Sequence, residues 1–285
     1  MCNFDFDFGK GVSAMIRTIL FLVILSSWAF MLAQEPRTST LDGSQAQSGA
    51  RPDNASPATP EGWQFAVSPY LWLSGIHGTV GVGGRDASVH AGFGDIVSNL
   101  NLGLMAATEL RRKRLLLLTD MMWIKLSEDK ALAENQVGEI TAKSRVQNFM
   151  LAPEVGYRFI EQPRFNVDAF TGFRYWHLGS SLEFEPNLLG QKLSTSQNWV
   201  DPLLGARLQT PLSPKLRFTV FGDVGGFGAG SQLEWQVAGL LGYQVNRRFT
   251  LQAGYRYLDV NYRSTEFKYD VAMSGLLLGT MIHFK

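Results

Sequence analysis

Thirteen charged side chains lie on the polar side of stretches in which apolar and polar residues alternate. Seven acids and six bases nearly cancel in this set, and every base is arginine: Glu109, Asp120, Glu154, Asp168, Asp201, Asp223, Glu234, Arg111, Arg158, Arg174, Arg207, Arg217 and Arg256. A guanidinium group binds a carboxylate through two parallel hydrogen bonds, which suits arginine to ion pairs in a confined space. The set therefore predicts charge pairing inside the protein or, around an open channel, selection among ions.

Other residue types that could do chemistry form weaker patterns. The four histidines have neither the spacing of a metal site nor a nucleophile motif: His77, His90, His177 and His283. The glycine-rich run at 222–230 is not followed by Lys-Ser or Lys-Thr, so it does not predict a phosphate-binding loop. We expect no catalytic residue, no metal ion and no cofactor, and hence no enzyme. The remaining enzymatic alternative is a lipid hydrolase that pairs His177 with Ser180 or Ser181.

The charged residues belong to segments that alternate with a period of two. In residues 231–245 the odd positions are apolar at Leu233, Trp235, Val237, Leu241, Tyr243 and Val245, whereas the even positions are polar or small apart from Leu240. A strand separates these two sets onto opposite faces, but a helix would mix them. The same pattern predicts strands at 63–74, 101–111, 114–126, 144–159, 164–176, 199–210, 215–227, 248–257 and 270–284.

Such alternation fits a soluble β-sandwich or a membrane-spanning barrel, and two features favour the barrel. Aromatic residues stand at opposite ends of the apolar faces, as in Trp235 with Tyr243, and eight residues of a tilted strand cover about 20 Å of membrane. Short turns at 112–113, 161–163, 213–214 and 246–247 also alternate with longer connections, notably 128–143 and 186–193. Short periplasmic turns and longer outer loops produce this rhythm. We predict an all-β fold, a transmembrane antiparallel up-and-down β-barrel over residues 62–285.

Pairing the strands backwards from residue 284 predicts about ten of them, within a range of eight to twelve. The uncertain stretch is 76–99. Its residues Val80, Val82, Ala87, Val89 and Ala91 predict a small extra hairpin, and the segment 95–100 predicts a helical turn capped by Asp95. Twelve strands, or a plug inside the barrel, remain alternatives.

The N-terminal part of the chain is predicted to consist of a signal peptide followed by a linker. Residues 18–32 form an apolar run after Arg17 and before the small residue Ala33, which is the layout of a signal peptide over 1–33. Met15 is a plausible alternative start. Residues 34–61 are rich in Ser, Pro, Gly and Gln and predict a disordered periplasmic linker. Cys2 is the sole cysteine of the chain, so no internal disulfide can form.

The last predicted strand carries a further signal. Gly279, Ile282 and Phe284 follow the order Gly-x-x-apolar-x-aromatic. This order resembles the C-terminal signal by which the barrel assembly machinery of the outer membrane recognises its clients. The strand departs from that pattern at Leu277, where a polar residue is usual, and at Lys285, which follows the aromatic residue.

Five motifs together resemble a family of uncharacterised bacterial outer-membrane β-barrel proteins, grouped loosely with small porin-like barrels. They are PYLWLSG at 69–75, GDIVSNLN at 94–101, NWVDPLLGAR at 198–207, GDVGGFG at 222–228 and GYRYLDVNY at 254–262. The resemblance covers residues 63–285 and implies a barrel in the outer membrane, without an established substrate.

Three hypotheses of function follow. The first is a porin-like barrel that passes small polar solutes through a narrow charged lumen, although the interior of a small barrel is just wide enough for side chains, which favours a structural network. The second is a non-conducting structural or surface-interaction barrel, and the third is the lipid hydrolase. The expected partners are outer-membrane lipid and lipopolysaccharide, together with the assembly machinery. A formal net charge of +1 gives no reason to expect nucleic acid, and the sequence leaves the oligomeric state open.

Overall fold

The computed structural model describes residues 62–135, 138–185 and 193–284. The predicted signal peptide over 1–33 and the predicted linker over 34–61 lie outside this part of the chain, so both stay predictions. No helix among the described residues is long and apolar enough to cross a membrane.

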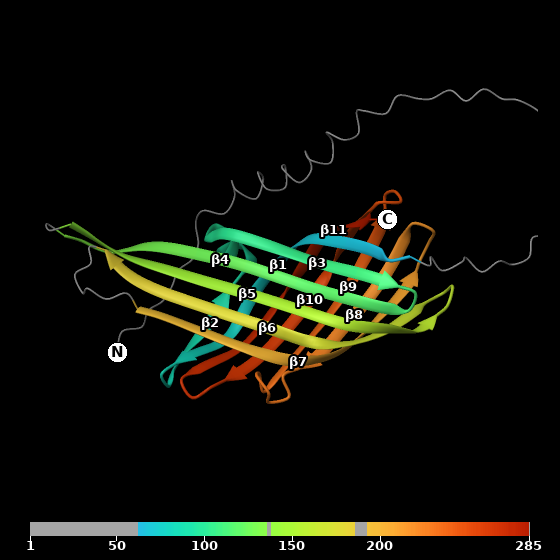
Figure 1. The fold of residues 1–285 in the computed structure, drawn as a ribbon. Helices are drawn as coiled ribbons and strands as arrows, with labels where there is room; N and C mark the ends of the chain where they lie inside the picture. The colour runs from blue at the N-terminus through green and yellow to red at the C-terminus, as the bar shows by residue number, and fades with distance from the viewer. Residues whose placement is uncertain (1–61, 136–137, 186–192, 285) are drawn as a thin grey trace, which may run out of the picture. The chain divides into compact units, whose positions relative to one another are not determined.

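One antiparallel sheet contains the described strands. Their order along the chain is β1 (Gln64–Val82), β2 (Arg85–Ala91), helix α2 (Phe93–Ser98), β3 (Leu100–Arg112), β4 (Leu115–Asn135), β5 (Gly138–Glu161), β6 (Asn166–Glu185), β7 (Leu193–Pro211), β8 (Leu216–Gly225), β9 (Leu233–Gln244), β10 (Phe249–Arg263) and β11 (Phe267–Phe284). Neighbours in sequence are neighbours in the sheet except for β2 and β3, since β3 pairs with β1. The last strand, β11, pairs back onto β1 from Phe65 opposite Phe284 to Val82 opposite Phe267. The sheet therefore closes into an up-and-down barrel (Figure 1).

The predicted strand number is confirmed, and the ambiguous stretch is settled. Within the described residues ten strands close the barrel, and β2 is an additional strand that pairs with the far half of β1. The helical turn also exists, but Asp95 is not its cap. The N-cap is Gly92, and Asp95 lies inside the first turn, where its carboxylate accepts a hydrogen bond of 2.8 Å from the Gly92 N–H. Asp95 thus stabilises the helix start from the third helical position.

The outer surface of the barrel is apolar and bounded by aromatic residues. Large hydrophobic side chains that face outward and are exposed include Leu117, Val155, Leu204, Leu241, Leu251, Leu276 and Leu278. At one end of this belt Trp123 and Tyr175 pack edge-on against Phe149, and Trp235 stacks on Tyr257 at 4.9 Å. At the other end are Tyr157, Phe159, Tyr243, Phe249 and Phe284. A closed barrel with such a belt spans a membrane, because closure of the sheet pairs the backbone hydrogen-bonding groups of neighbouring strands.

The short turns that the sequence predicted are present at one end of the barrel. They lie at 113–114, 162–165, 212–215 and 245–248, and this is the end predicted to face the periplasm. At the opposite end some connections are equally short, such as 83–84 and 264–266, so the orientation of the barrel stays a prediction. On the outer side the predicted loop 128–143 is wrong, because most of it is strand. β4 continues to Asn135 and β5 begins at Gly138. Both faces of a hairpin meet water above the membrane, so the alternation that marks a membrane-spanning strand disappears there.

Toward the outer side the barrel wall divides into two parts. β3 pairs with β1 only along Gln64–Pro69, and β7 pairs with β8 only along Leu203–Pro211. Beyond these positions the first wall, β3 to β7, is separate from the second wall, β8 to β11 with β1 and β2 (Figure 1). Helix α2 lies beside β1 and β2 at one division, and the β8–β9 connection at 226–232 hydrogen-bonds to β7 at the other through the Gly226 N–H and the Pro202 carbonyl.

Close packing of β1 against β11 makes a glycine indispensable. Gly275 lies opposite Ser74, and an added β-carbon at this position would stand 2.0 Å from the Leu73 carbonyl oxygen. We expect Gly275→Ala to lower the free energy of unfolding of the refolded barrel by about 1–3 kcal/mol, measured by urea titration, because the backbone must shift to accept the methyl group. Gly62→Ala is the control, because no atom lies within 4 Å of its added carbon. Equal stability of the two variants would contradict the close approach.

Candidate functional site in the barrel interior

The inward positions nearest the periplasmic turns hold a compact cluster of ion pairs. Arg158 donates to Asp168 through Nε at 2.7 Å and Nη2 at 3.2 Å, and Arg207 donates to the same carboxylate through Nε at 3.0 Å. Arg207 also donates to Glu109 of β3 at 2.8 Å, and Arg158 donates to Gln209 at 3.1 Å. Two guanidinium groups and two carboxylates balance in this cluster, which ties β3, β5, β6 and β7 together.

A second cluster lies further from the periplasm and is centred on Arg174. Its guanidinium donates to Glu234 at 3.0 Å and to Asp223 at 3.1 Å, and these three side chains are buried. The Trp176 indole N–H donates to the other oxygen of Glu234 at 2.9 Å, and the Gln236 amide donates to Asp223. One arginine therefore holds two carboxylates in this cluster, which joins β6 to β8 and β9.

Arg256 forms the remaining interior ion pair. Its Nη1 lies 2.9 Å from an Asp120 oxygen, and the Tyr70 hydroxyl donates to Asp120 at 2.6 Å. The guanidinium carbon stands 4.8 Å from the centre of the Trp72 ring. The Nε and Nη2 groups of Arg256 are buried and have no partner among the described residues. This arrangement links β10 to β1 and β4 across the interior.

Four residues of the predicted network do not join these clusters. Asp201 binds neutral donors instead of an arginine: the Ser231 N–H at 2.5 Å, the Ser231 hydroxyl at 2.6 Å and the Trp199 indole at 2.9 Å. Arg111 donates to the Gln64 amide oxygen at 2.8 Å. Arg217 is exposed next to the start of β8. Glu154 makes no hydrogen bond and no ion pair within the described part of the chain, although it faces the interior. These four residues therefore lie outside the ion-pair clusters, which contain the other nine charged residues of the predicted set.

A cavity of about 180 Å³ lies between the cluster around Arg158 and the pair of Arg256. Each of the ten barrel strands contributes to its wall. The polar part of that wall includes Glu109, Asp120, Glu154, Arg207, Asp223, Gln236 and Arg256, and the apolar part includes Leu118, Phe170, Phe221, Leu240, Leu277 and Met281.

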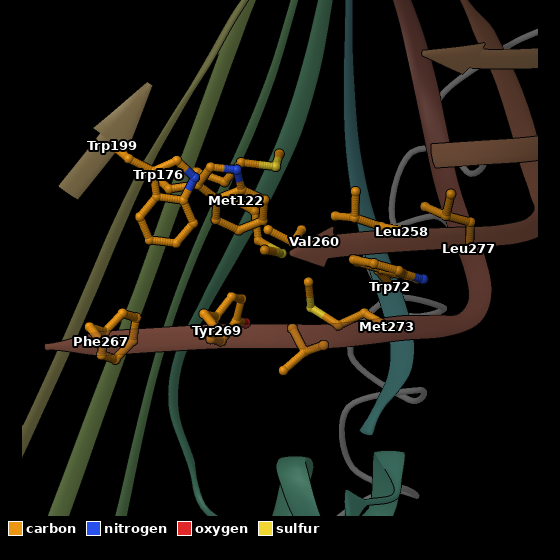
Figure 2. Close-up of a cluster of buried hydrophobic side chains, with 12 residues drawn as sticks. Trp72, Met122, Trp176, Trp199, Leu258, Val260, Phe267, Tyr269, Met273 and Leu277 are labelled. Atoms are coloured by element: carbon orange, nitrogen blue, oxygen red, sulfur yellow. The ribbon is translucent and has the colours of Figure 1, made fainter. Parts of the chain in front are cut away.

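On the outer side of the ion pairs, the interior is filled by apolar and aromatic side chains. The buried members are Trp72, Met122, Met150, Trp176, Trp199, Leu258, Val260, Phe267, Tyr269, Val271, Met273 and Leu277, which we call the apolar layer. Figure 2 shows Trp176, Trp199 and Met122 of the first wall facing Val260 and Tyr269 of the second. Trp199 stacks on Tyr262 at 4.1 Å and lies 5.8 Å from Trp176. The apolar layer thus joins the two walls where the sheet itself no longer does.

The sequence contained a signal for this layer that its charged neighbours obscured. Trp176 has the inward parity of Arg174, and Trp199 has the inward parity of Asp201. Leu258, Val260 and Tyr262 likewise continue the inward series that begins at Arg256. Every second residue after an inward charged residue also points inward. Continuing this series along each strand toward the outer side identifies the five side chains just named.

The histidine at the outer rim has partners other than a serine. His177 Nδ1 lies 2.6 Å from the Asn198 amide oxygen, which also accepts from the Tyr175 hydroxyl at 3.1 Å. Among the described residues no group of three His, Cys, Asp or Glu side chains could hold a metal ion. The absence of an enzymatic activity stays a prediction, and so does the absence of a cofactor.

The proposed assembly signal lies in β11, the strand that closes the barrel. Gly279 pairs with Tyr70 of β1, and Ile282 pairs with both Val67 and Phe249. Phe284 packs against Phe65 with ring centres 5.6 Å apart. These residues complete the seam between the first and last strands, and their recognition by the assembly machinery stays a prediction.

The closed barrel, its apolar belt and its short turns are the architecture of an outer-membrane protein, so the chain is an outer-membrane β-barrel. No protein-family model matches the sequence, and no curated protein matches it either.

Solved outer-membrane barrels resemble the structure at low identity. The outer-membrane protease OmpT from Escherichia coli is 8% identical with a TM-score of 0.49, over 81% of this chain and 100% of that chain. Neisserial surface protein A is 15% identical with a TM-score of 0.33, over 79% and 100%. The toluene transporter TodX of P. putida is 10% identical with a TM-score of 0.32, over 79% and 90%. These values are too low to bring the activity of any of these proteins to this chain.

Proposed function

We propose that this protein is a non-conducting outer-membrane barrel that presents a tall β-sheet to the outside of the cell. The observation that supports this function best is the filled interior. Ion pairs occupy the periplasmic half, and the apolar layer occupies the outer half. A passage for solutes would have to displace both.

The energetic cost of opening the interior supports a closed resting state. Met122, Met150 and Trp176 are at most 1% exposed, and Trp199 is 5% exposed. Exposing four such side chains to a water-filled passage costs about 6–12 kcal/mol at roughly 1.5–3 kcal/mol each. Thermal motion alone rarely supplies that free energy, so passive diffusion of polar solutes is disfavoured.

The length of the first wall supports a role at the outer surface. β5 has 24 residues, whereas β8 has 10. At about 3.3 Å per residue and a tilt of about 40°, β5 spans about 60 Å and β8 about 25 Å, which matches the apolar belt of a barrel. Four neighbouring strands, β4 to β7, therefore extend well above the membrane as one sheet. Such a sheet offers a broad surface to a partner outside the cell.

A second candidate function is porin-like passage of small polar solutes, gated by the apolar layer. The charged cavity on the periplasmic side favours it, since a solute would find polar groups there. The division of the wall on the outer side also favours it, since the two walls could move apart at the apolar layer without breaking strand pairs. Passage in this case would require a signal that separates the walls.

Conductance of the refolded full-length barrel in a planar bilayer distinguishes the two candidates. We expect no channel current for the wild type. We expect discrete openings for the double variant Trp176→Ala and Trp199→Ala, because removal of two stacked indoles from the apolar layer leaves room for water. Trp235→Ala is the matched control, since Trp235 faces the membrane, and it should stay closed.

Steady wild-type openings above background would contradict the closed barrel and favour the porin-like candidate. Silence of the double variant, with a folded barrel shown by heat-dependent migration in gels, would mean that the ion pairs alone seal the interior.

The surroundings of the barrel are also part of the proposal. We expect lipopolysaccharide to contact the outer girdle near Trp123, where the Lys125 ammonium lies 4.7 Å from the indole ring and could also bind an anionic headgroup. We expect the assembly machinery to recognise the strand that contains Gly279, Ile282 and Phe284. No enzymatic activity is part of this proposal.

A further inference from the structure

More acidic than basic side chains surround the interior cavity. Asp120, Glu154 and Asp223 line it together with Arg256, and Arg174, which lies outside the lining, is shared by Asp223 and Glu234. By contrast, the cluster nearer the periplasm contains two arginines and two acids and is balanced. The cavity therefore has room for a positive charge that the protein itself does not supply.

Two acceptors on the cavity wall have no donor within the described residues. Glu154 lines the cavity and makes no hydrogen bond and no ion pair. Gln236 also lines it, is 5% exposed, and has a buried amide oxygen without a partner, since only its amide nitrogen is bonded, to Asp223. A buried acceptor without a donor is costly. A ligand with several N–H groups would satisfy both acceptors together.

The rest of the wall limits which cation could bind. No group of three metal-ligating side chains exists among the described residues, so an inner-sphere metal ion is disfavoured. The cavity of about 180 Å³ is far larger than a metal ion, and Phe170, Phe221, Leu240 and Met281 make much of its wall apolar. Aromatic faces also attract ammonium groups. These features fit a charged nitrogen attached to a short apolar body.

We propose that the cavity binds a small organic ammonium ion, with its nitrogen between Glu154 and Gln236 and its alkyl part against the apolar wall. The site goes beyond the closed-barrel function and does not depend on whether the barrel conducts. The ligand enters from the periplasmic side past Glu109 and Arg207, whose side chains are 20% and 12% exposed. The apolar layer closes the opposite end.

Isothermal titration of the refolded full-length barrel in detergent tests the proposal with three probes of equal length. We expect n-propylammonium to bind, and both n-propanol and propionate to bind at least tenfold more weakly, because only the ammonium supplies a positive charge and three donors. These probes are very soluble in water, so partition into the micelle stays small. Equal binding of propylammonium and propanol would overturn the proposal, because the cavity would then recognise the alkyl chain alone.

Variants locate the site. We expect Glu154→Gln to weaken propylammonium binding at least tenfold, whereas the matched substitution Glu161→Gln, at the exposed end of β5, should leave it unchanged. Glu154 has no partner to lose, so its variant should fold, and heat-dependent migration in gels verifies this. Absence of propylammonium binding to the wild type, or full binding by Glu154→Gln, would overturn the proposal. Absence of binding to the wild type would mean that water occupies the cavity or that a proton neutralises Glu154.

Discussion

Arg174→Met is expected to lower the free energy of unfolding of the barrel by about 3–5 kcal/mol, the cost of leaving buried charges without a partner. Arg174 is fully buried and holds both Asp223 and Glu234, which are themselves buried. Methionine fills a similar volume, so the loss is electrostatic and not a cavity. Urea titration of the refolded barrel in lipid vesicles, followed by tryptophan fluorescence, measures the change.

Two further variants make this prediction specific. Arg217→Met removes an exposed arginine and should change the stability by less than about 0.5 kcal/mol. The triple variant Arg174→Met, Asp223→Asn and Glu234→Gln removes all three charges and should recover most of the lost stability, because neutral groups tolerate burial better than a lone charge. If Arg174→Met is as stable as Arg217→Met, Arg174 does not hold the middle of the barrel together.

Asp201→Ala is expected to release the β8–β9 connection at 226–232 and to lower the stability by about 2–4 kcal/mol, since it deprives buried donors of a charged acceptor. Asp201 is buried and accepts from the Ser231 backbone, the Ser231 hydroxyl and the Trp199 indole. Hydrogen exchange read by mass spectrometry should show faster exchange at 226–232 and no change at the β3–β4 turn. Trp199 should also become mobile, because its indole loses the bond that fixes it in the apolar layer.

Two controls test whether Asp201 acts locally, by holding the β8–β9 connection, or only through the loss of a charged residue. Asp201→Asn keeps one acceptor oxygen and should fall between the wild type and Asp201→Ala. Asp86→Ala breaks only an exposed pair with Lys268 at the outer hairpin and should cost less than about 1 kcal/mol. If Asp201→Ala accelerates hydrogen exchange uniformly over the whole barrel, Asp201 does not act locally on the β8–β9 connection.

The alternation of apolar and polar residues predicted the fold, because successive residues of a barrel strand face the membrane and the interior in turn. In β9, for example, Trp235 and Val237 face the membrane while Glu234 and Gln236 face the interior, as the sequence indicated. The alternation disappears where both faces of a strand meet water. For this reason the sequence predicts a loop over 128–143, whereas in the structure β4 continues to Asn135.

The candidate site could be predicted only in part. Parity placed Arg158, Asp168, Arg174 and Glu234 on the inner face, but parity is a property of one strand and says nothing about the strand opposite. Arg207 pairs with Glu109 across 98 positions of the sequence, and only the curvature of the closed sheet brings those two together. For the same reason the sequence did not predict that Asp201 accepts hydrogen bonds from Ser231 of a connecting loop and not from an arginine.

By itself, the sequence determined that the chain forms strands and which of their faces meets lipid, because these properties follow from local alternation. The tertiary structure alone decided how the inward side chains occupy the interior. Whether inward side chains leave a pore depends on the number of strands and on how far each strand is shifted against its neighbours. Those shifts put Trp176, Trp199 and Tyr262 at one level and leave Glu154 alone beside a cavity.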